Sequence, residues 1–192
     1  MARTDNKTFY NTSLEKYGKS AQGVRWNSQK SQFIRFKILV NFLPKEIDRL
    51  SIVDAGCGFG DLYLYLKEEY KAPKSYVGLE MMQEMITEAK VRTGCEIYDC
   101  DILKDKLIEA DYYVCSGAMN ILTCFETTLF ISRCFKASKK GFIFNLLEGE
   151  DESLVYNYFL PKEIKKIAKE LGATIKIKKG YLERDFSVAF YK

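Results

Sequence analysis

The sequence predicts an α/β protein in which a mostly parallel sheet, covered by helices on both faces, is finished by an antiparallel hairpin. From Ser51 onward, short apolar runs alternate with amphipathic segments, which is the pattern of parallel strands joined by helices. Residues 173–192 break this rhythm, because two runs of alternating apolar and polar residues are separated there only by a short polar loop. A length of 192 residues suits one domain.

The strands are predicted from short apolar runs. We expect the parallel strands over 51–56, 75–80, 95–100, 111–117 and 141–148, and the hairpin strands over 173–179 and 186–192. Sheets of this kind bind ligands at the carboxyl ends of their strands. The candidate site residues should therefore follow the ends of these runs.

The helices are predicted from apolar residues that recur three or four positions apart. A helix over 31–43, ended by Pro44, precedes the first strand. Further helices are expected over 61–71, 81–92, 125–140 and 161–172. Residues 1–30 are polar with scattered aromatic side chains, so we expect an N-terminal extension or lid there and the domain itself over 31–192.

The composition excludes several kinds of chemistry. The chain has no histidine, which removes Ser-His and Cys-His nucleophile systems and the commonest general base. Its six cysteines never form C-x-x-C, so we expect buried thiols in a reducing, cytoplasmic setting and no metal site. No stretch is apolar and long enough to suggest a membrane segment.

The net charge of +4 is concentrated near the C-terminus, where residues 161–192 hold nine Lys or Arg against four Asp or Glu. Such a face can meet nucleic acid or an anionic substrate, or it can simply be solvated. We favour the solvated face, because the lysines alternate with isoleucines as in a half-buried strand.

The segment "IVDAGCGFGDLY", residues 52–63, follows the first strand with three glycines at alternate positions. A dinucleotide-binding fingerprint needs G-x-G-x-x-G, and Asp61 stands where its third glycine should be. A carboxylate there would face a pyrophosphate. The loop therefore indicates a ligand without a phosphate.

"VDAGCGFG" resembles the first motif of the class I S-adenosylmethionine-dependent methyltransferases. The resemblance implies a Rossmann-like sheet of seven strands in the order 3-2-1-4-5-7-6, with the last strand antiparallel and an N-terminal helical lid. It also implies that Gly56, Gly58 and Gly60 lie against the methionine part of the cofactor, and that Asp54 helps to hold its amino group.

Two further stretches resemble the next motifs of this family. "YVGLEMMQEMITEAK" resembles the second-strand motif, which implies that Glu80 binds both ribose hydroxyls and that Met81 packs on the adenine. "YDCDILKD" resembles the third-strand motif, which implies contacts from the Asp101 side chain and the Ile102 backbone to the adenine.

The acceptor is expected near the ends of the fourth and fifth strands. "DYYVCSGAMN" resembles the fourth-strand motif of the family, which runs past the transferable methyl group; it places Ser116 at the cofactor. Asn120 and Glu148 are the candidates for catalysis, and Asn145 is a candidate for the acceptor. Glu148 is the only carboxylate among these four residues, so it is the candidate base or substrate orienter.

The N-terminal part adds candidates for the cofactor and the lid. Gln32 and Arg35 lie three apart, hence on one helix face, and Arg35 either pairs with the cofactor carboxylate or forms a surface ion pair. Tyr17 or Trp26 closes over the sulfonium or the substrate, where an aromatic face favours a cation; the alternative for Trp26 is packing in the core.

Together these features predict a methyltransferase that uses S-adenosyl-L-methionine, releases S-adenosyl-L-homocysteine and methylates a small molecule on oxygen. RNA methylation and a non-catalytic binding protein with the same fold are the alternatives, and a nicotinamide-dependent oxidoreductase ranks below them. Nucleic acid is thus a partner that we do not favour, and the sequence does not predict an oligomeric state.

Overall fold

The structure is a computed structural model, and it describes residues 29–150, 153 and 155–192. The expected lid over 1–30, with Tyr17 and Trp26, therefore lies almost wholly outside the described residues. The roles expected for these two side chains stay predictions.

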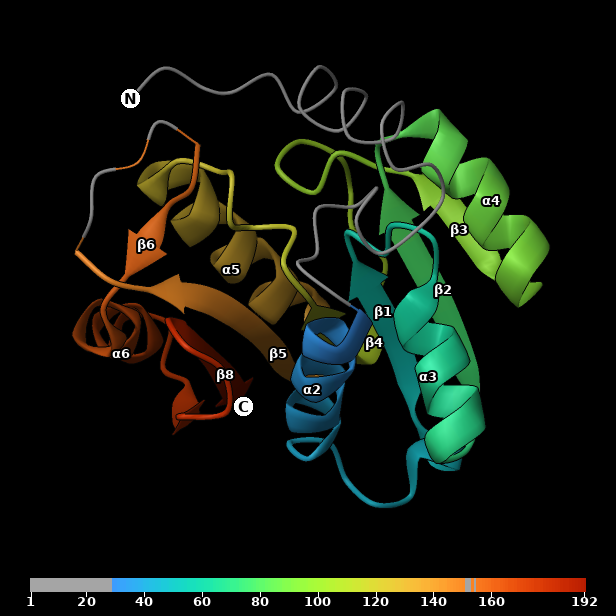
Figure 1. Cartoon of the computed structure of the whole chain (residues 1–192), viewed down its shortest axis with the longest axis horizontal. Coiled ribbons are helices and arrows are strands. Elements are labelled where there is room, and N and C mark those ends of the chain that lie inside the picture. The colour runs from blue at the N-terminus through green and yellow to red at the C-terminus, as the bar shows by residue number, and fades with distance from the viewer. Residues whose placement is uncertain (1–28, 151–152, 154) are drawn as a thin grey trace.

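One mixed sheet forms the centre of the molecule (Figure 1). Its order is β3-β2-β1-β4-β5-β8-β7, and β8 runs antiparallel to both β5 and β7. This confirms the predicted order of seven strands and the antiparallel last strand. The bounds are β1 Ser51–Ala55, β2 Ser75–Glu80, β3 Glu96–Asp99, β4 Ala110–Cys115, β5 Ser138–Glu148, β7 Thr174–Lys179 and β8 Asp185–Tyr191.

An eighth strand, β6 (Tyr158–Phe159), was not expected from the sequence. It pairs in parallel with Leu147 and Glu148, beyond the residues of β5 that pair with β4. Two residues are too few for a periodic pattern, so only the tertiary pairing defines this strand.

Helices cover both faces of the sheet because side chains alternate between the faces along each strand. Ile52 packs with α2 and α3 on one face, and Val53 packs with α5 and α6 on the other. On β4, Tyr112 packs on the same face as Ile52, and Tyr113 packs on the same face as Val53. The helices are α2 Gln29–Val40, α3 Asp61–Glu69, α4 Gln83–Thr93, α5 Cys124–Ala137 and α6 Pro161–Glu170, and the short 3-10 helix η1 spans Ile47–Arg49.

The boundary between α5 and β5 differs from the prediction. The expected helix over 125–140 ends at Ala137, and β5 begins at Ser138 instead of Gly141. Ser138 already pairs with Ala110 of β4, and Lys140 forms an ion pair with Asp111. Strand pairing decides this boundary, and a helical pattern within one segment cannot reveal it.

The basic residues near the C-terminus lie partly along an edge of the sheet. β7 is the edge strand beside β8, and its Ile175 and Ile177 pack against the core while Lys176 and Lys178 are exposed. Charged side chains on an open edge strand prevent pairing with other chains. This arrangement favours a solvated face over a nucleic-acid interface.

None of the helices in the described part of the chain is long and apolar enough to cross a bilayer.

Candidate functional site

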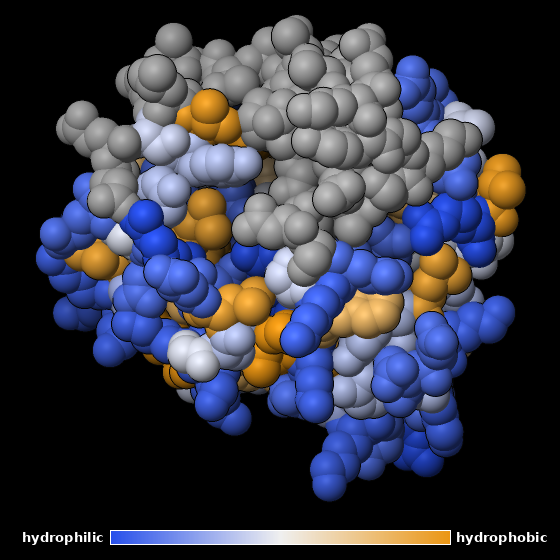
Figure 2. Space-filling model, viewed as in Figure 1, coloured by the Kyte–Doolittle hydropathy of each residue, from blue (hydrophilic) through white to orange (hydrophobic). Residues whose placement is uncertain are grey.

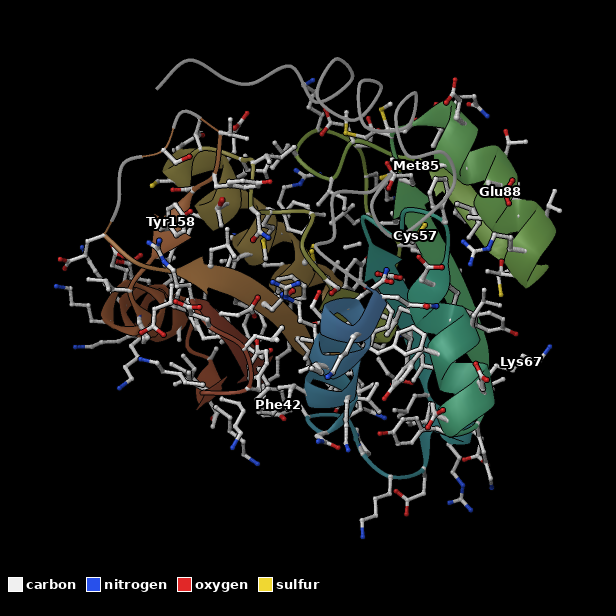
Figure 3. The ribbon with its side chains drawn as sticks, in the orientation of Figure 1. Phe42, Cys57, Lys67, Met85, Glu88 and Tyr158 are labelled. Atoms are coloured by element: carbon white, nitrogen blue, oxygen red, sulfur yellow. The ribbon has the colours of Figure 1, made fainter. Side chains whose placement is uncertain are left out.

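A cavity of about 530 Å³ opens at the carboxyl ends of β1, β2 and β4. Figure 3 labels three of the residues that line it: Cys57 and Met85 lie on one side and Tyr158 on the other. On the same face of the molecule, apolar residues gather towards the middle and hydrophilic ones surround them (Figure 2). The cavity is thus where an α/β sheet is expected to bind its ligand.

Most of the residues that the sequence singled out line this cavity. They come from the ends of four strands and from one helix. The β1 and β2 ends contribute Asp54, Gly56, Gly58, Glu80 and Met81; the β3 and β4 ends contribute Asp101, Ile102, Ser116 and Asn120; and α2 contributes Gln32 and Arg35.

The glycine loop and the loop after β4 touch each other at Gly56. This glycine has a φ of 79°, and a Cβ on it would overlap the Cβ of Ala118. Ala118 lies between Ser116 and Asn120 in sequence. The two loops therefore meet without room for a side chain, and this contact joins the β1 side of the cavity to its β4 side.

Gly60 does not line the cavity, which differs from its expected place beside the cofactor. It caps the start of α3 with a φ of 77°, and a Cβ there would lie 2.5 Å from Thr93 Cγ2 on α4. The close approach of α3 and α4 requires this glycine. Its role is helix packing.

Glu80 is held rigidly at the end of β2. Its Oε1 accepts hydrogen bonds from the backbone N–H groups of Met81 (2.8 Å) and Met82 (3.1 Å), and its Oε2 accepts one from Gly58 (3.0 Å). Burial raises the pKa of this carboxyl, and the three donors oppose that effect. The contact with Gly58 links the carboxylate to the glycine loop.

Asp54 is buried beneath the same loop. Its Oδ2 accepts a hydrogen bond from the Tyr76 hydroxyl at 2.5 Å. Burial raises the pKa of Asp54 to about 7; the hydrogen bond from Tyr76 lowers it, and the charges of Glu80 and Asp61 raise it further. A cationic group at this place would favour the charged carboxylate.

Asp61 explains the departure from the dinucleotide fingerprint. It accepts hydrogen bonds from Gln32 Nε2 at 3.1 Å and from Arg92 at 2.6 Å. Gln32, which was expected to contact the cofactor, is buried and donates to this carboxylate while its side chain lines the cavity. The carboxylate in place of the third glycine thus connects α2, α3 and α4.

Arg35 forms an ion pair, as one of the two interpretations expected, but the pair is buried and not on the surface. Its guanidinium donates to Asp185 at the start of β8, and the Asp185 side chain is fully buried. The other oxygen of Asp185 accepts a hydrogen bond from the Tyr181 hydroxyl. Burial raises the pKa of Asp185, and Arg35 counteracts this.

The turn after β3 is fixed by its own side chain and by α5. Asp101 Oδ1 accepts from the Leu103 backbone at 3.0 Å, and its Oδ2 pairs with Lys104 at 2.8 Å. Arg133 of α5 donates to the carbonyl oxygen of Ile102 at 2.6 Å and also to that of Asp105. Sequence reasoning missed Arg133, because a helical arginine carries no signal of a partner some thirty residues earlier.

Two polar atoms at the end of β4 are buried without a hydrogen-bond partner among the described residues: Ser116 Oγ and Asn120 Oδ1. Both side chains line the cavity. A buried polar atom without a partner costs about 1–3 kcal/mol. A ligand that hydrogen-bonds to these two atoms would remove this cost.

The candidates on β5 lie elsewhere. Asn145 is fully buried outside the cavity lining, and its Oδ1 accepts from the Gly117 backbone at 3.0 Å. Glu148 also lies outside the lining, and its carboxylate pairs with Lys179 of β7. Asn145 therefore supports the loop after β4, and of the two candidates for catalysis only Asn120 lines the cavity.

Sequence reasoning also missed Tyr158 and Arg184, which line the cavity from β6 and from the turn before β8. Elsewhere, residues 29–150, 153 and 155–192 contain no cluster of three or more acidic or cysteine side chains that could hold a metal ion.

Comparisons with known proteins agree with this geometry. The family model for a methyltransferase domain matches residues 52–141, which include the glycine loop and the ends of β2, β3 and β4. The Rv1506c protein of Mycobacterium tuberculosis, whose name calls it a methyltransferase, is 32% identical over 117 residues. That match covers 55% of this chain and 68% of the relative.

Solved structures share the fold at low sequence identity. The magnesium protoporphyrin IX methyltransferase of Synechocystis PCC 6803, crystallised with S-adenosylhomocysteine, has a TM-score of 0.77 at 14% identity, covering 98% of this chain and all of that chain. The pyocyanin biosynthetic protein PhzM has a TM-score of 0.71 at 13% identity, covering 95% of this chain and 61% of that chain. From its relative, its matched domain and its strand order, the chain belongs to the class I S-adenosylmethionine-dependent methyltransferases.

Proposed function

We propose that this methyltransferase transfers the methyl group of S-adenosylmethionine to an oxygen of a small-molecule acceptor. The observation that carries the proposal is the pair of buried, unpartnered atoms Ser116 Oγ and Asn120 Oδ1, which line one cavity together with Asp54 and Glu80. An acceptor beside Ser116 and Asn120 would meet a cofactor held by the β1 and β2 ends, because the two loops touch at Gly56 and Ala118.

The residues on the β1 and β2 side fit the cofactor. Asp54 supplies a buried carboxylate for the amino group, and Gly56 and Gly58 bring the backbone of the glycine loop to the cavity lining. Glu80 has a fixed orientation, and its Oε2, with one backbone donor, has capacity for a ribose hydroxyl. When bound, the cofactor supplies an electrophilic methyl group on its sulfonium.

The task of the chain's own residues is to position the acceptor. Holding two reacting atoms about 3–3.5 Å apart and aligned can contribute on the order of 7–11 kcal/mol to catalysis. Asn120 Oδ1 can accept a hydrogen bond from the hydroxyl group that is to be methylated, and so direct a lone pair of the hydroxyl oxygen. Ser116 Oγ can donate a hydrogen bond to the same molecule or accept one from it.

A hydroxyl acceptor fits this site better than a group without a proton. Asn120 Oδ1 is only an acceptor, so its partner must carry a hydrogen. Glu148 pairs with Lys179 outside the cavity lining, and Asp54 lies under the glycine loop. We therefore infer that positioning of the acceptor contributes most of the catalysis, and that the proton of its hydroxyl is released to solvent.

The first experiment separates cofactor use from other ligands. Calorimetry should give micromolar binding of S-adenosylhomocysteine and none of NAD or NADP; the reverse result would refute the assignment. A screen of small hydroxyl compounds and of bulk RNA with methyl-labelled cofactor, read by mass spectrometry, should then label a small molecule. Labelled RNA with no labelled small molecule would contradict the proposed acceptor class.

The second experiment tests the acceptor side. Asn120→Ala should lower kcat for the acceptor about tenfold or more while the Kd for S-adenosylhomocysteine stays within about twofold, since only the hydrogen bond to the acceptor is lost. Glu148→Gln is the matched control and should retain kcat. If Glu148→Gln loses kcat while Asn120→Ala keeps it, Glu148 and not Asn120 is the residue that orients the acceptor.

A further inference from the structure

The loop after β4 is anchored at Gly117. The N–H group of Gly117 donates to Asn145 Oδ1 at 3.0 Å, and its carbonyl oxygen accepts a hydrogen bond from the Asn120 backbone N–H at 3.2 Å. Gly117 lines the cavity, as do Ser116 and Asn120 on either side of it. The position of Gly117 therefore determines where the two unpartnered atoms, Ser116 Oγ and Asn120 Oδ1, lie in the cavity.

The hydrogen bond from Gly117 requires one orientation of the Asn145 amide. An amide has an accepting oxygen on one side and a donating NH₂ group on the other, so a half-turn would direct the NH₂ group at the Gly117 N–H. Two donors would then face each other. Because Asn145 is fully buried, this arrangement would leave both donors without a partner, which is costly. A neighbour that distinguishes the two orientations of the amide would thus hold the loop in place.

Strand register places a carboxylate beside Asn145. In the antiparallel pairing of β5 with β8, Ser187 is the direct partner of Asn145, and Asp185 lies two residues away from Ser187. Residues two apart on a strand share a face of the sheet, so Asp185 is a diagonal neighbour of Asn145. Asn145 Nδ2 forms no hydrogen bond within the described part of the chain, yet it lies close enough to Asp185 to lower the pKa of that carboxyl.

Arg35 favours the charged form of Asp185. Burial raises the pKa of the Asp185 carboxyl, and the charge and hydrogen bonds of Arg35 on α2 oppose this most strongly. The Tyr181 hydroxyl donates to the other oxygen of Asp185 and lies 2.7 Å from Ser187 Oγ. A carboxylate attracts the NH₂ side of an amide and repels the oxygen side. Asp185 therefore favours the orientation in which Asn145 presents its oxygen to the loop.

We propose that Asp185 is a positioning residue for the methyl acceptor. By orienting the Asn145 amide it holds Gly117, and through Gly117 it places Ser116 and Asn120. This inference rests on the proposed function, which assigns Ser116 and Asn120 to the acceptor. Loss of the carboxylate should release the loop after β4 and leave cofactor binding intact.

The test replaces both members of the buried ion pair, because removal of one member alone leaves an uncompensated buried charge. Arg35→Met/Asp185→Leu puts apolar side chains of similar size in both places and should keep the Tm near that of the wild type. Asp185→Asn is the second variant, which keeps the shape of the side chain and removes its charge.

Hydrogen exchange of the Gly117 amide, measured by NMR, reads the position of the loop directly. In the double variant the Gly117 amide should exchange about fivefold faster or more, while the Val53 amide in the central strand β1 exchanges as in the wild type. Asp185→Asn should accelerate Gly117 in the same direction. Unchanged exchange at Gly117 in a folded double variant would overturn the proposal.

Two variants on β5 complete the comparison. Asn145→Leu removes the acceptor of the Gly117 N–H itself and should accelerate its exchange at least as much. If it does so while the double variant does not, Asn145 holds the loop without Asp185 and the proposal is wrong. Ile143→Ala is the matched control, since Ile143 is fully buried two residues before Asn145; it should not accelerate Gly117 more than Val53.

Kinetics distinguish positioning of the acceptor from a purely structural role. With methyl-labelled S-adenosylmethionine and the hydroxyl compound that the wild type labels in the acceptor screen, kcat of the double variant should fall about tenfold, while the Kd for S-adenosylhomocysteine stays within about threefold. Ile143→Ala, assayed well below its Tm, should keep kcat. Equal losses of kcat in both variants, or a matching loss of S-adenosylhomocysteine binding in the double variant, would refute the positioning role.

The two kinds of measurement separate the possible failures. If the wild type binds S-adenosylhomocysteine but labels no small hydroxyl compound, the proposed function is wrong, and exchange at Gly117 still decides whether Asp185 holds the loop. If the double variant methylates the acceptor as fast as the wild type does, the proposed function stands and only the role of Asp185 is refuted.

Discussion

Asp61 Oδ2 accepts a hydrogen bond from Gln32 Nε2 at 3.1 Å, which joins the first turn of α3 to α2. The second oxygen of Asp61 binds Arg92 of α4, whose other amino group donates to the carbonyl oxygen of Phe59. One carboxylate therefore fixes the glycine loop against two helices. In the dinucleotide-binding fingerprint the same position is a small residue, usually glycine, that lets the helix pack closely on the strand.

We expect Asp61→Ala to weaken binding of S-adenosylhomocysteine about tenfold and to lower the Tm by several degrees. Gln32 is buried and would lose its partner, at a cost of about 1–3 kcal/mol. Calorimetry and thermal unfolding measure the two effects. Asp48→Asn removes an exposed ion pair with Lys71 and should change neither quantity; equal behaviour of the two variants would refute the role of Asp61.

Gly56→Ala should abolish detectable cofactor binding, because the new Cβ would overlap Ala118 where the two loops meet. Gly172→Ala is the matched control. Gly172 has a similar φ of 68°, but a Cβ there would meet nothing within 4 Å. The control carries only the backbone strain, about 1 kcal/mol, and should bind normally. If both variants bind equally, the close contact at Gly56 is unimportant.

Asp54 should make cofactor binding depend on pH. Its pKa is raised to about 7, so the empty site holds a largely neutral carboxyl at pH 6, whereas the amino group of S-adenosylhomocysteine favours the anion. Binding should tighten as pH rises from about 5.5 to 7.5 and level off above. A Kd titration in this range measures it, and Asp54→Asn should bind weakly with no such rise.

The Asp54 carboxyl should also make the free energy of unfolding depend on pH. Whereas cofactor binding tightens as pH rises, the stability of the protein without cofactor should fall. The folded-state pKa of Asp54 lies above the unfolded value of 3.8, so the native state holds the proton more tightly. The contribution of Asp54 to the free energy of unfolding is thus present below about pH 4 and is lost as pH rises to about 7. The free energies of unfolding of wild type and Asp54→Asn, measured with denaturant, should converge at low pH. Between pH 4 and 7 the two should depend on pH with different slopes, because only the wild type has the titrating carboxyl.

Arg133→Ala should weaken cofactor binding about threefold to tenfold. Arg133 holds the carbonyl oxygens of Ile102 and Asp105 and so fixes the turn that carries Asp101. The neighbouring exposed Lys136, mutated to alanine, controls for a lost cation on α5. Unchanged binding in Arg133→Ala would show that Asp101 and Lys104 fix the turn unaided.

The sequence by itself determined the fold and which residues at the β1, β2 and β3 ends line the cavity. Strands alternating with helices predict the parallel sheet, and the ends of consecutive parallel strands meet at one edge. Asp54, Gly56, Glu80 and Asp101 therefore follow from local pattern and position, and all four line the cavity. Local pattern suffices here because each residue lies directly after its own strand.

Only the tertiary structure decided which side chains share the other end of the cavity. Asn120 faces it while Asn145 and Glu148 do not, because β5 is paired with β8 and its side chains are used by the Gly117 backbone and by Lys179. Arg184 and Tyr158 come from a turn and a two-residue strand with no periodic signal of their own. Contacts between segments distant in sequence depend on strand register, which a linear pattern does not contain.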